Sequence, residues 1–280
     1  MKNALTNPYE IEKGSICNMS NAAMHVAKTG VEAQQLKMQV IANNLANVNT
    51  TGFKKDRVNF ETLVYQVKKM AGAQTSEGTE ATSGLNVGTG ARVVSAEKLF
   101  SQGAISSTDN ALDLAISGGG FFQIVLPDGK FGYSRDGSFI RNGEGVLCTA
   151  DGFVLQPEIT IPPNVVNISI GANGAVSVNL PGQDAPTNVG QLQLATFVNP
   201  AGLAPIGSNF LVETNVSGNA ALNNPMQNGT GKLIQGSLEN SNVKVVQELV
   251  DMIETQRAYE VSSKAITATD EMLRYINQNL

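Results

Sequence analysis

ANNLANVNTTGFK, residues 42–54, is the stretch that decides how the chain is divided. Up to Leu45 the sequence has helical periodicity, with apolar or small residues at alternating steps of three and four. Asn47 and Thr50 then offer the backbone local side-chain hydrogen bonds that compete with a helix. Gly52 can take the left-handed conformation that closes helices. The stretch therefore predicts that a long N-terminal helix stops here and that a different structure follows.

The helix before this stretch carries apolar residues on two sides. One stripe has heptad spacing, and the other lies nearly opposite it at about 100° per residue. The first includes Met24, Val31, Met38, Ile41, Leu45 and Val48, and the second includes Val26, Leu36 and Val40. A helix with two apolar faces needs two neighbours. We therefore expect these residues to form polymer interfaces, one stripe packing within the chain and the other against a neighbouring molecule.

The last part of the chain, from Val245 to Leu280, repeats this arrangement. Polar residues such as Gln256 interrupt one face at every seventh position, where they usually fix register and partner. The residues expected in polymer contacts are Val245, Leu249, Met252, Ile253, Gln256, Tyr259, Ile266 and Leu273. We predict an α+β fold whose long terminal helices form a coiled-coil-like inner domain. A purely intramolecular helix pair is the alternative, although the doubled stripes favour contacts with further molecules.

Between the helical patterns the chain is rich in Gly, Asn and Ser, and from Arg92 to about Ser237 the hydrophobic period shifts toward two. The expected strands are Arg92–Glu97, Leu112–Ser117, Phe121–Leu126, Phe131–Ser134, Ser138–Arg141, Val146–Ala150, Asn167–Ile170, Ala175–Val178, Leu192–Phe197, Phe210–Thr214 and Leu233–Ser237. The tight-hairpin dipeptides are Asp128-Gly129, Asp136-Gly137, Asn142-Gly143, Asp151-Gly152 and Asn173-Gly174. An antiparallel, hairpin-rich β body is expected.

The segment that joins the first helix to this body has weaker signals. Phe60, Leu63, Val64 and Val67 have a helix-like spacing, whereas residues 71–91 are small and polar and predict an extended loop or linker. The predicted segments are a helix over 19–52, a connection over 53–91, a β-rich outer domain over 92–237 and a helix over 238–280. Residues 1–18 show neither period. We interpret them as a non-native extension and expect Met19 to be the true start.

Composition and charge exclude several classes of function. The net charge of −5 argues against nucleic-acid binding, which needs a concentrated cationic face. No apolar run approaches the roughly 18 residues of a membrane span, so no membrane insertion is expected. His25 is the single histidine, and Cys17 and Cys148 lack metal-ligand spacing. We therefore expect no catalytic residue, no metal and no cofactor.

Three weaker motifs are better explained by local backbone structure than by a functional site. Gly88-Thr89-Gly90 partly resembles a dinucleotide fingerprint but precedes a strand instead of a helix. Gly118-Gly119-Gly120 also opens a strand, where a bulge or a close backbone approach is expected. Asp128, Asp136 and Asp151 could suggest the paired carboxylates of a glycoside hydrolase. Each is followed by Gly, however, which is typical of a turn.

Several longer motifs together resemble one family. The stretch Ala42-Asn43-Asn44-Leu45-Ala46-Asn47-Val48-Asn49-Thr50-Thr51-Gly52-Phe53-Lys54 is similar to the signature that ends the N-terminal helix of bacterial flagellar rod and hook proteins. Further similar segments, in the family's order, are Val26–Gly30, Gly118–Ile124, Tyr133–Phe139, Glu239–Val243 and Met252–Glu260. The segment from Tyr65 to Gly90 resembles the stretch that sets the distal rod protein apart from the hook.

The resemblance implies a structural subunit of the flagellar basal body that spans the periplasm. Its implied partners are copies of itself, the proximal rod and hook proteins, the ring proteins around the rod and the flagellar type III export apparatus, which exports the family without a cleaved signal peptide. A proximal rod or hook subunit is the nearest alternative. A cell-wall carbohydrate-binding or hydrolytic β domain is an alternative from another class, suggested by the acidic turns.

Overall fold

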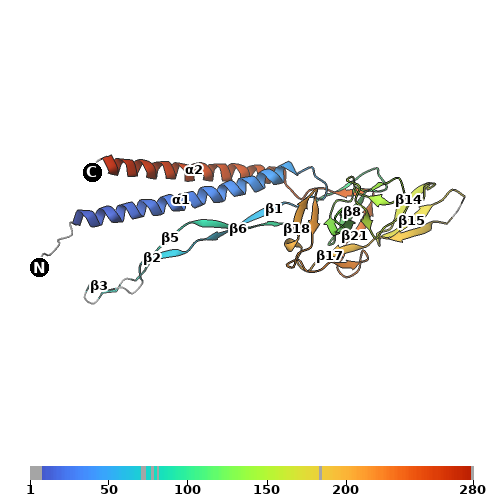
Figure 1. Cartoon of the computed structure of the whole chain (residues 1–280), viewed down its shortest axis with the longest axis horizontal. Helices are drawn as coiled ribbons and strands as arrows, with labels where there is room; N and C mark the ends of the chain where they lie inside the picture. Colours follow the sequence, from blue (N-terminus) through green and yellow to red (C-terminus); the bar gives the residue numbers. More distant parts are fainter. Residues whose placement is uncertain (1–7, 71–73, 77–78, 81, 183–184, 279–280) are drawn as a thin grey trace. The chain divides into compact units, whose positions relative to one another are not determined.

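The computed structural model describes residues 8–70, 74–76, 79–80, 82–182 and 185–278 (Figure 1). Among these residues there are two α-helices, α1 (Pro8–Ala46) and α2 (Val245–Gln278), with short strands between them in sequence. The chain forms two compact units. The helix-ribbon unit holds residues 1–43, 56–97 and 246–280, and the body unit holds residues 44–55 and 98–245. A β-rich body with a helix toward each end of the sequence is therefore confirmed.

The prediction of a coiled-coil-like inner domain is wrong. In the described part of α1 the buried apolar side chains are Ala33 and Ile41, and in that of α2 the buried residues are polar, Glu248, Thr255 and Thr269. Among the helix residues whose burial is described, no continuous apolar seam joins the two helices, because most stripe residues keep a substantial exposed area. A stripe in the sequence identifies which side of a helix is apolar, but not what covers it. The described helices also contain no stretch that is long and apolar enough to cross a membrane.

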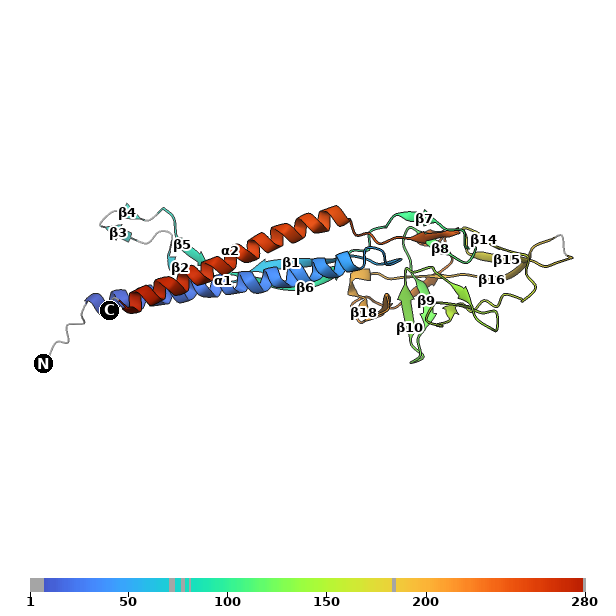
Figure 2. The ribbon, with the colours of Figure 1, turned by 90° about the horizontal axis from the view of Figure 1, so that it is seen from above.

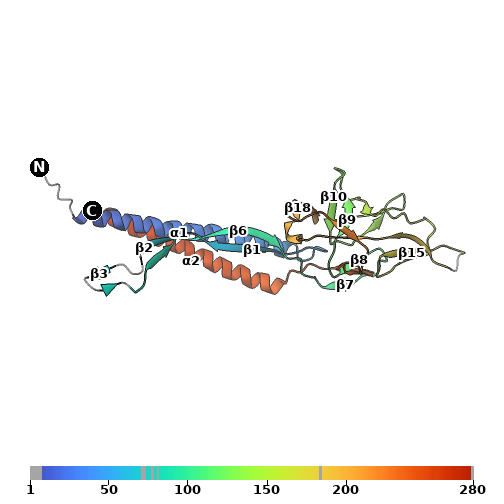
Figure 3. The same ribbon diagram turned by 90° about the horizontal axis from the view of Figure 1, so that it is seen from below.

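The helix-ribbon unit also contains a long β-ribbon, where a helix-like segment and a loop were expected. Its strands are β1 (Asp56–Thr62), β2 (Tyr65–Lys69), β3 (Gln74–Ser76), β4 (Thr79–Glu80), β5 (Leu85–Gly88) and β6 (Ala91–Lys98). They pair in nested order, β1 with β6, β2 with β5 and β3 with β4. Figure 3 shows β1 and β6 side by side. Ion pairs Arg57–Glu97 and Arg92–Glu61 link the outer pair. Gly90 lies so close to α1 that a Cβ there would be 2.2 Å from Thr29 Oγ1.

The body unit contains the remaining strands, most of them short. They are β7 (Ile105–Ser107), β8 (Leu114–Ser117), β9 (Phe122–Val125), β10 (Phe131–Ser134), β11 (Ile140–Arg141), β12 (Leu147–Cys148), β13 (Leu155–Gln156), β14 (Asn167–Ile170), β15 (Ala175–Asn179), β16 (Thr187–Gln191), β17 (Leu194–Thr196), β18 (Ala204–Gly207), β19 (Phe210–Val212), β20 (Ala221–Asn223), β21 (Lys232–Gln235) and β22 (Ser237–Glu239). A 3₁₀ turn, η1, spans Pro200–Gly202. Each strand expected from the period of two overlaps one of the observed strands.

The strands of the body unit pair mainly antiparallel. The largest sheet has five strands in the order β13-β9-β10-β19-β18, and a second has three in the order β14-β15-β16. Chain neighbours β9 and β10 pair with Phe131 opposite Val125 and Ser134 opposite Phe122. Strand β8 pairs with β21 and β7 with β22, so strands from the start and the end of the body lie side by side. This pairing brings segments that are distant in sequence to the same place.

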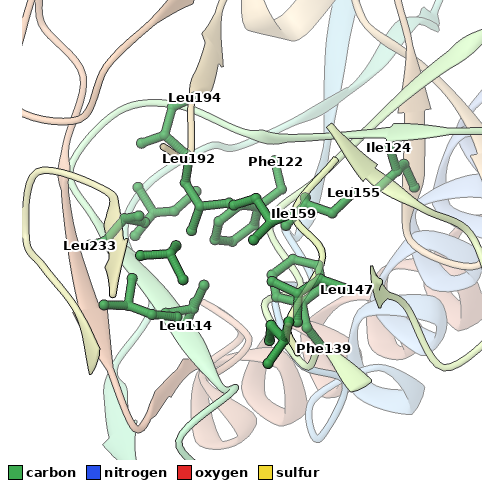
Figure 4. Packing of buried hydrophobic residues seen from close by; sticks show 14 of the residues in the cluster. Leu114, Phe122, Ile124, Phe139, Leu147, Leu155, Ile159, Leu192, Leu194 and Leu233 are labelled. Atoms are coloured by element: carbon green, nitrogen blue, oxygen red, sulfur yellow. The ribbon is translucent and has the colours of Figure 1, made fainter. Parts of the chain in front are cut away.

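The core of the body unit is built from residues of both of these sheets and of neighbouring strands and loops. Its buried side chains include Leu114, Phe122, Ile124, Phe139, Leu147, Leu155, Ile159, Leu192, Leu194 and Leu233 (Figure 4). Phe122 and Phe139 meet edge to face with ring centroids 5.0 Å apart, a geometry that stabilises aromatic pairs beyond their buried area. Cys148 is a free, buried cysteine, and in this position it acts as a small hydrophobic residue. The body unit thus has a complete core of its own.

Candidate functional site

The signature stretch leaves α1 through two successive turns. The helix ends at Ala46, and backbone bonds from Thr50 N to Asn47 O (3.2 Å) and from Phe53 N to Thr50 O (3.3 Å) continue the chain. Thr50 Oγ1 also donates to Asn47 Oδ1 at 3.2 Å. These local bonds, two between backbone groups and one between two side chains, turn the chain away from the helical path. Gly52 has the predicted left-handed conformation, with φ of 68°, but it lies beyond the helix end and closes the second turn.

Gly52 brings the backbone of the signature stretch against the body. A Cβ at this position would be 2.7 Å from both the carbonyl carbon of Arg135 and the amide nitrogen of Asp136. The amide of Gly52 donates to the carbonyl of Glu239 at 2.7 Å. The position therefore needs glycine for two reasons, the left-handed φ and the close approach of another backbone.

Three charged side chains meet under this turn. Glu239 accepts from Lys54 Nζ at 2.6 Å through one carboxylate oxygen and from Arg135 Nη1 at 3.2 Å through the other. The side chains of Lys54, Glu239 and Arg135 are 3%, 0% and 6% exposed. We call this group the Glu239 triad. It joins the segment after α1, the segment before α2 and the end of β10.

Additional hydrogen bonds offset the cost of burying the three charges of the Glu239 triad. Lys54 Nζ also donates to the carbonyl of Ser101 at 2.8 Å, and the amide of Gly103 donates to Glu239 Oε1 at 2.8 Å. Burial lowers the pKa of Lys54 and of Arg135, and their bonds to Glu239 oppose that shift. A buried ion pair keeps its charges only when its geometry and its remaining hydrogen bonds are good. Removal of one partner should therefore be costly.

Asn242 provides a second link between the same segments. Its Nδ2 donates to the carbonyl of Leu99 at 2.8 Å, and its Oδ1 accepts from the amide of Lys55 at 2.8 Å. Its own amide donates to the carbonyl of Phe53 at 3.4 Å. The family-like segments around residues 42–54 and 239–243 are therefore hydrogen-bonded to each other.

The β18–β19 hairpin holds the signature stretch from another side. Its turn places Ser208 and Asn209 at positive φ, 48° and 60°. Asn209 Nδ2 donates to the carbonyl of Thr51 at 2.8 Å, and the carbonyl of Asn209 accepts from Ser134 Oγ at 3.2 Å. A left-handed Asn at a tight turn is well tolerated. Here it also fixes the path of the chain after α1.

A cavity of about 500 Å³ opens beside the signature stretch, and all its lining residues belong to the body unit. Four phenylalanines, Phe53, Phe100, Phe121 and Phe210, contribute to its wall. The Arg135 guanidinium lies 5.3 Å from the centroid of Phe121, and Lys98 Nζ lies 5.1 Å from that of Phe53. Both distances are within the range of cation–π attraction.

The other motifs have structural roles in the body. The three glycines at 118–120 make the expected close backbone approach, since the amide of Gly231 donates to the carbonyl of Gly119 at 2.7 Å and a Cβ on Gly118 would be 2.8 Å from Gly231 Cα. Asp136 accepts from the amide and hydroxyl of Ser138, and burial raises the pKa of Asp136 despite these bonds. Among the described residues, no cluster of His, Cys, Asp and Glu is arranged to hold a metal ion.

The predicted interface residues lie on both helices, except Val48, which follows the end of α1, and they differ in exposure. Val26 and Leu36 on α1 are exposed, as are Leu249, Ile253, Gln256 and Tyr259 on α2, while Val245 at its start is exposed as well. Partly buried positions are Met24, Val31, Met38, Val40, Leu45, Val48, Met252, Ile266 and Leu273. Ile41 and the signature residue Asn44 are buried, and Ala42, Asn43 and Ala46 are exposed. The role of these residues in polymer contacts stays a prediction.

Sequence reasoning missed the Glu239 triad, Asn242 and Asn209. Lys54 and Glu239 are 185 residues apart, so no local pattern connects them. The available signal was that residues of opposite charge stand inside separate family-like segments.

Comparison with known proteins assigns the chain to a family. Three family models match, described as "Flagella basal body rod protein" over residues 24–54, "Flagellar hook protein FlgE/F/G D1 domain" over 115–178 and "Flagellar basal body rod FlgEFG protein C-terminal" over 234–279. The flagellar basal-body rod protein FlgG of Buchnera aphidicola subsp. Schizaphis graminum is 52% identical over 256 residues, which are 91% of this chain and 98% of the relative.

The chain belongs to the flagellar basal-body rod protein family. FlgG of Caulobacter vibrioides is 45% identical over 257 residues, 91% of this chain and 98% of that protein. FlgG of Bacillus subtilis is 40% identical over 252 residues, 88% of this chain and 94% of that protein. The rod protein is thus a structural subunit of the flagellar basal body. The matched segments include the signature stretch and Glu239. The contacts between Glu239 and the signature stretch therefore lie in segments typical of the rod family.

Proposed function

We propose that this rod protein forms the distal part of the rod by polymerising into a hollow helical shaft, which transmits motor torque to the hook and serves as an export channel. In this proposal the chain acts as a structural part and not as an enzyme. Its partners are copies of itself, the proximal rod and hook proteins, the surrounding ring proteins and the type III export apparatus.

The observation that carries this proposal is the uncovered apolar surface of the helices. On α2, Val246, Ile253, Val261 and Met272 are between 51% and 76% exposed. On α1, Val26 and Leu36 are also exposed. Contiguous apolar patches on a soluble protein mark interaction sites. Long helices also gain most of their stability from packing of an apolar face, and within one chain these helices pack such a face only in part.

Neighbouring copies can supply that packing. Complete burial of one Leu or Ile side chain contributes roughly 1.5–3 kcal/mol, and the stripes offer several such residues. A head-to-tail contact that does not close into a ring repeats into a helical filament. Contacts along both terminal helices would thus join each subunit to more than one neighbour, as a shaft under torque requires.

The β-ribbon supports the assignment to the distal rod. It includes the segment from Tyr65 to Gly90, whose sequence resembles the stretch that distinguishes the distal rod protein from the hook. The side chains of β2 are exposed, including Tyr65 and Val67. A two-stranded ribbon with exposed apolar side chains is marginally stable in water. Deletion of residues 71–88 is expected to leave a polymer of altered stiffness, measured from rod bending in electron micrographs.

A substitution on α2 tests the proposal. Ile253→Asp places a charge on the exposed stripe and should abolish rod formation and motility, while the circular dichroism spectrum of the body strands is retained. Thr267→Asp is the matched control, because Thr267 is an exposed polar residue of the same helix and gains the same charge. Normal rods with Ile253→Asp would refute the interface. The position of labelled protein along isolated basal bodies would separate a distal rod subunit from a proximal rod or hook subunit.

A further inference from the structure

Residues 165–170, Val-Val-Asn-Ile-Ser-Ile, have the composition of a segment that pairs with copies of itself. Two Val and two Ile residues give the segment high β-propensity, and it contains no charged residue, no Pro and no Gly. Six- or seven-residue segments of this kind stack into cross-β structures when they are exposed on a sheet edge. The position of the segment in the fold therefore matters.

The structure places this segment at a sheet edge. Strand β14 is the outermost strand in the order β14-β15-β16, and Figure 2 shows these three strands side by side. Among the described strands β14 pairs only with β15, in a regular register without a bulge. The apolar stretch Phe121–Leu126 differs, because its strand β9 lies between β13 and β10. An edge strand such as β14 presents backbone groups that can template pairing with another chain.

The side chain of Gln235 covers this edge. The amide of Ile170 donates to Gln235 Oε1 at 3.0 Å, and Gln235 Nε2 donates to the carbonyl of Ile168 at 2.9 Å. Successive residues of a strand direct their backbone groups to opposite sides, and the amide of Gly171 donates to the carbonyl of Ala175 within the hairpin. The two groups that bind Gln235 therefore point away from β15. The side-chain amide takes the place that a peptide group of another strand would occupy.

Further contacts fix Gln235 in this position. Its Nε2 also donates to the carbonyl of Ala111 at 2.8 Å, and its backbone pairs with Leu114 in the β8–β21 ladder. The amide of Leu233, two residues earlier, donates to the carbonyl of Ala172 at 3.1 Å, just after β14. Both protons and the oxygen of the half-buried side-chain amide thus have partners. This arrangement holds the amide against β14.

The segment itself has little other protection. Natural edge strands often carry charged residues, Pro or bulges that prevent pairing with another chain. No charged residue stands in the sequence between Glu158 and Asp184. Val166 is 75% exposed, and Asn167 and Ser169 are exposed as well. Gln235 therefore covers an edge that its own side chains leave attractive to another strand.

We propose that Gln235 is an edge guard, which prevents a second copy of residues 165–170 from pairing with β14 of this chain. Without the guard, copies would join edge to edge through this segment, because identical uncharged strands pair favourably in a cross-β stack. Such a contact would join body units and would not use the helix stripes. The guard therefore restricts self-association through the body, and this inference does not depend on the proposed function.

Replacement of the guard in the full chain tests this inference. Gln235→Met keeps a side chain of similar length but removes both donors and the acceptor. Hydrogen exchange of the Ile170 amide should become about tenfold faster, as expected when one hydrogen bond is lost. The variant should also form fibres that bind thioflavin and show the infrared band of intermolecular β-structure. Gln193→Met is the matched control, because Gln193 is also half-buried in the body and its Nε2 donates to Asn224 Oδ1 at 3.5 Å. It should cause neither change.

A second substitution separates the edge contact from a general loss of stability. Ser169→Lys, added to Gln235→Met, places a charge on the exposed face of β14 and should suppress the fibres. It should not restore the slow exchange of the Ile170 amide, since the hydrogen bond is still missing. The amides of β9 report in the same experiment whether the body is folded, and they should stay protected in both variants.

Three results would overturn the proposal. They are unchanged exchange at Ile170 without fibres in Gln235→Met, fibres that Ser169→Lys does not reduce, and loss of protection in β9 equal to that at Ile170. The last result would give Gln235 a general structural role instead. Rod formation by the unchanged chain tests the proposed function separately, because the edge guard concerns only the body unit.

Discussion

The Glu239 triad in the body unit and the two terminal helices differ in which side chains they bury. In the Glu239 triad, three charged side chains are almost completely buried, and Glu239 has hydrogen-bond partners on both carboxylate oxygens within the chain. On the described part of α2, by contrast, no apolar side chain is buried and several are more than half exposed. The body unit thus buries its charged and apolar groups within one chain, whereas the helices leave apolar side chains exposed, which the proposed polymer contacts would cover.

This division matches the needs of a polymer subunit. Within the body unit, the bond between Lys54, which follows α1, and Glu239, which precedes α2, joins the two segments that lead to the helices. Helices that stay uncovered until a neighbour arrives keep their binding surface available. Substitutions in the two regions should therefore have different consequences, one on folding and the other on assembly.

Replacement of Glu239 should have the largest effect. Glu239→Gln leaves two buried cations without an anion and is expected to lower the free energy of unfolding of the body by about 3–5 kcal/mol. Urea denaturation followed by circular dichroism measures this loss. Glu144→Gln, at an exposed turn, should change the stability by less than about 0.5 kcal/mol. Equal stability of the two variants would mean that the Glu239 triad does not hold the junction together.

Glycine at position 52 should be the next most important. Gly52→Ala forces a side chain into left-handed backbone and against the backbone of Arg135. Gly218→Ala is the matched control, since Gly218 has a similar φ of 77° and open space around its Cα. Both should pay about 1–2 kcal/mol for the left-handed conformation. The overpacked Gly52→Ala variant should lose about 1–3 kcal/mol more, and equal losses would argue against the close approach.

The helix stripe should affect assembly without affecting the monomer. Val261→Ser replaces a 67% exposed side chain of α2, so monomer stability should change by less than about 0.5 kcal/mol. The critical concentration for rod formation should rise about tenfold, as expected when roughly 1.5 kcal/mol of apolar burial is lost at a contact. Val198→Ser, at a 96% exposed position of the body, is the control and should change neither quantity. A lower unfolding temperature of the Val261→Ser monomer would contradict the claim that the helix stripe affects assembly and not the stability of the monomer.

The smallest effect concerns alkaline pH. Burial, together with nearby Glu213, raises the pKa of Tyr133 to about 12 from the usual 10. The stability contributed by the neutral tyrosine is complete below about pH 10 and is lost as the pH rises through about 12, because the unfolded chain ionises first. Tyr133→Phe should therefore lose less stability than the unchanged chain between about pH 9 and about pH 11.5 in urea titrations. Parallel losses in both proteins would rule out this contribution.

Much of the body could be predicted from the sequence because its signals are local. Phe131–Ser134 and Asn167–Ile170 were expected as strands with the bounds that β10 and β14 have. The turn glycines Gly129, Gly152 and Gly174 have positive φ, consistent with their hairpin dipeptides. Period and turn chemistry act over a few residues, so a single sequence reveals them.

The rest depends on contacts that local patterns do not encode. The spacing of Phe60, Leu63, Val64 and Val67 fits a helix, yet the segment forms β1 and β2 because it pairs with β6 and β5 across the ribbon. The α1 helix begins at Pro8, well before residue 19, where the helix was expected to start. The coiled-coil prediction failed because most residues of the two stripes are not buried between the helices but keep exposed area. In the candidate site, the signature stretch was found by resemblance, but its buried charge partner was not.

Hydrogen–deuterium exchange on the monomer and on the assembled rod tests the central claim most directly. The account predicts that amides of β9 and β10 are protected in both states, whereas amides of α2 become strongly protected only in the rod. Protection of α2 in the monomer equal to that in the rod would contradict the claim that neighbours complete the helices.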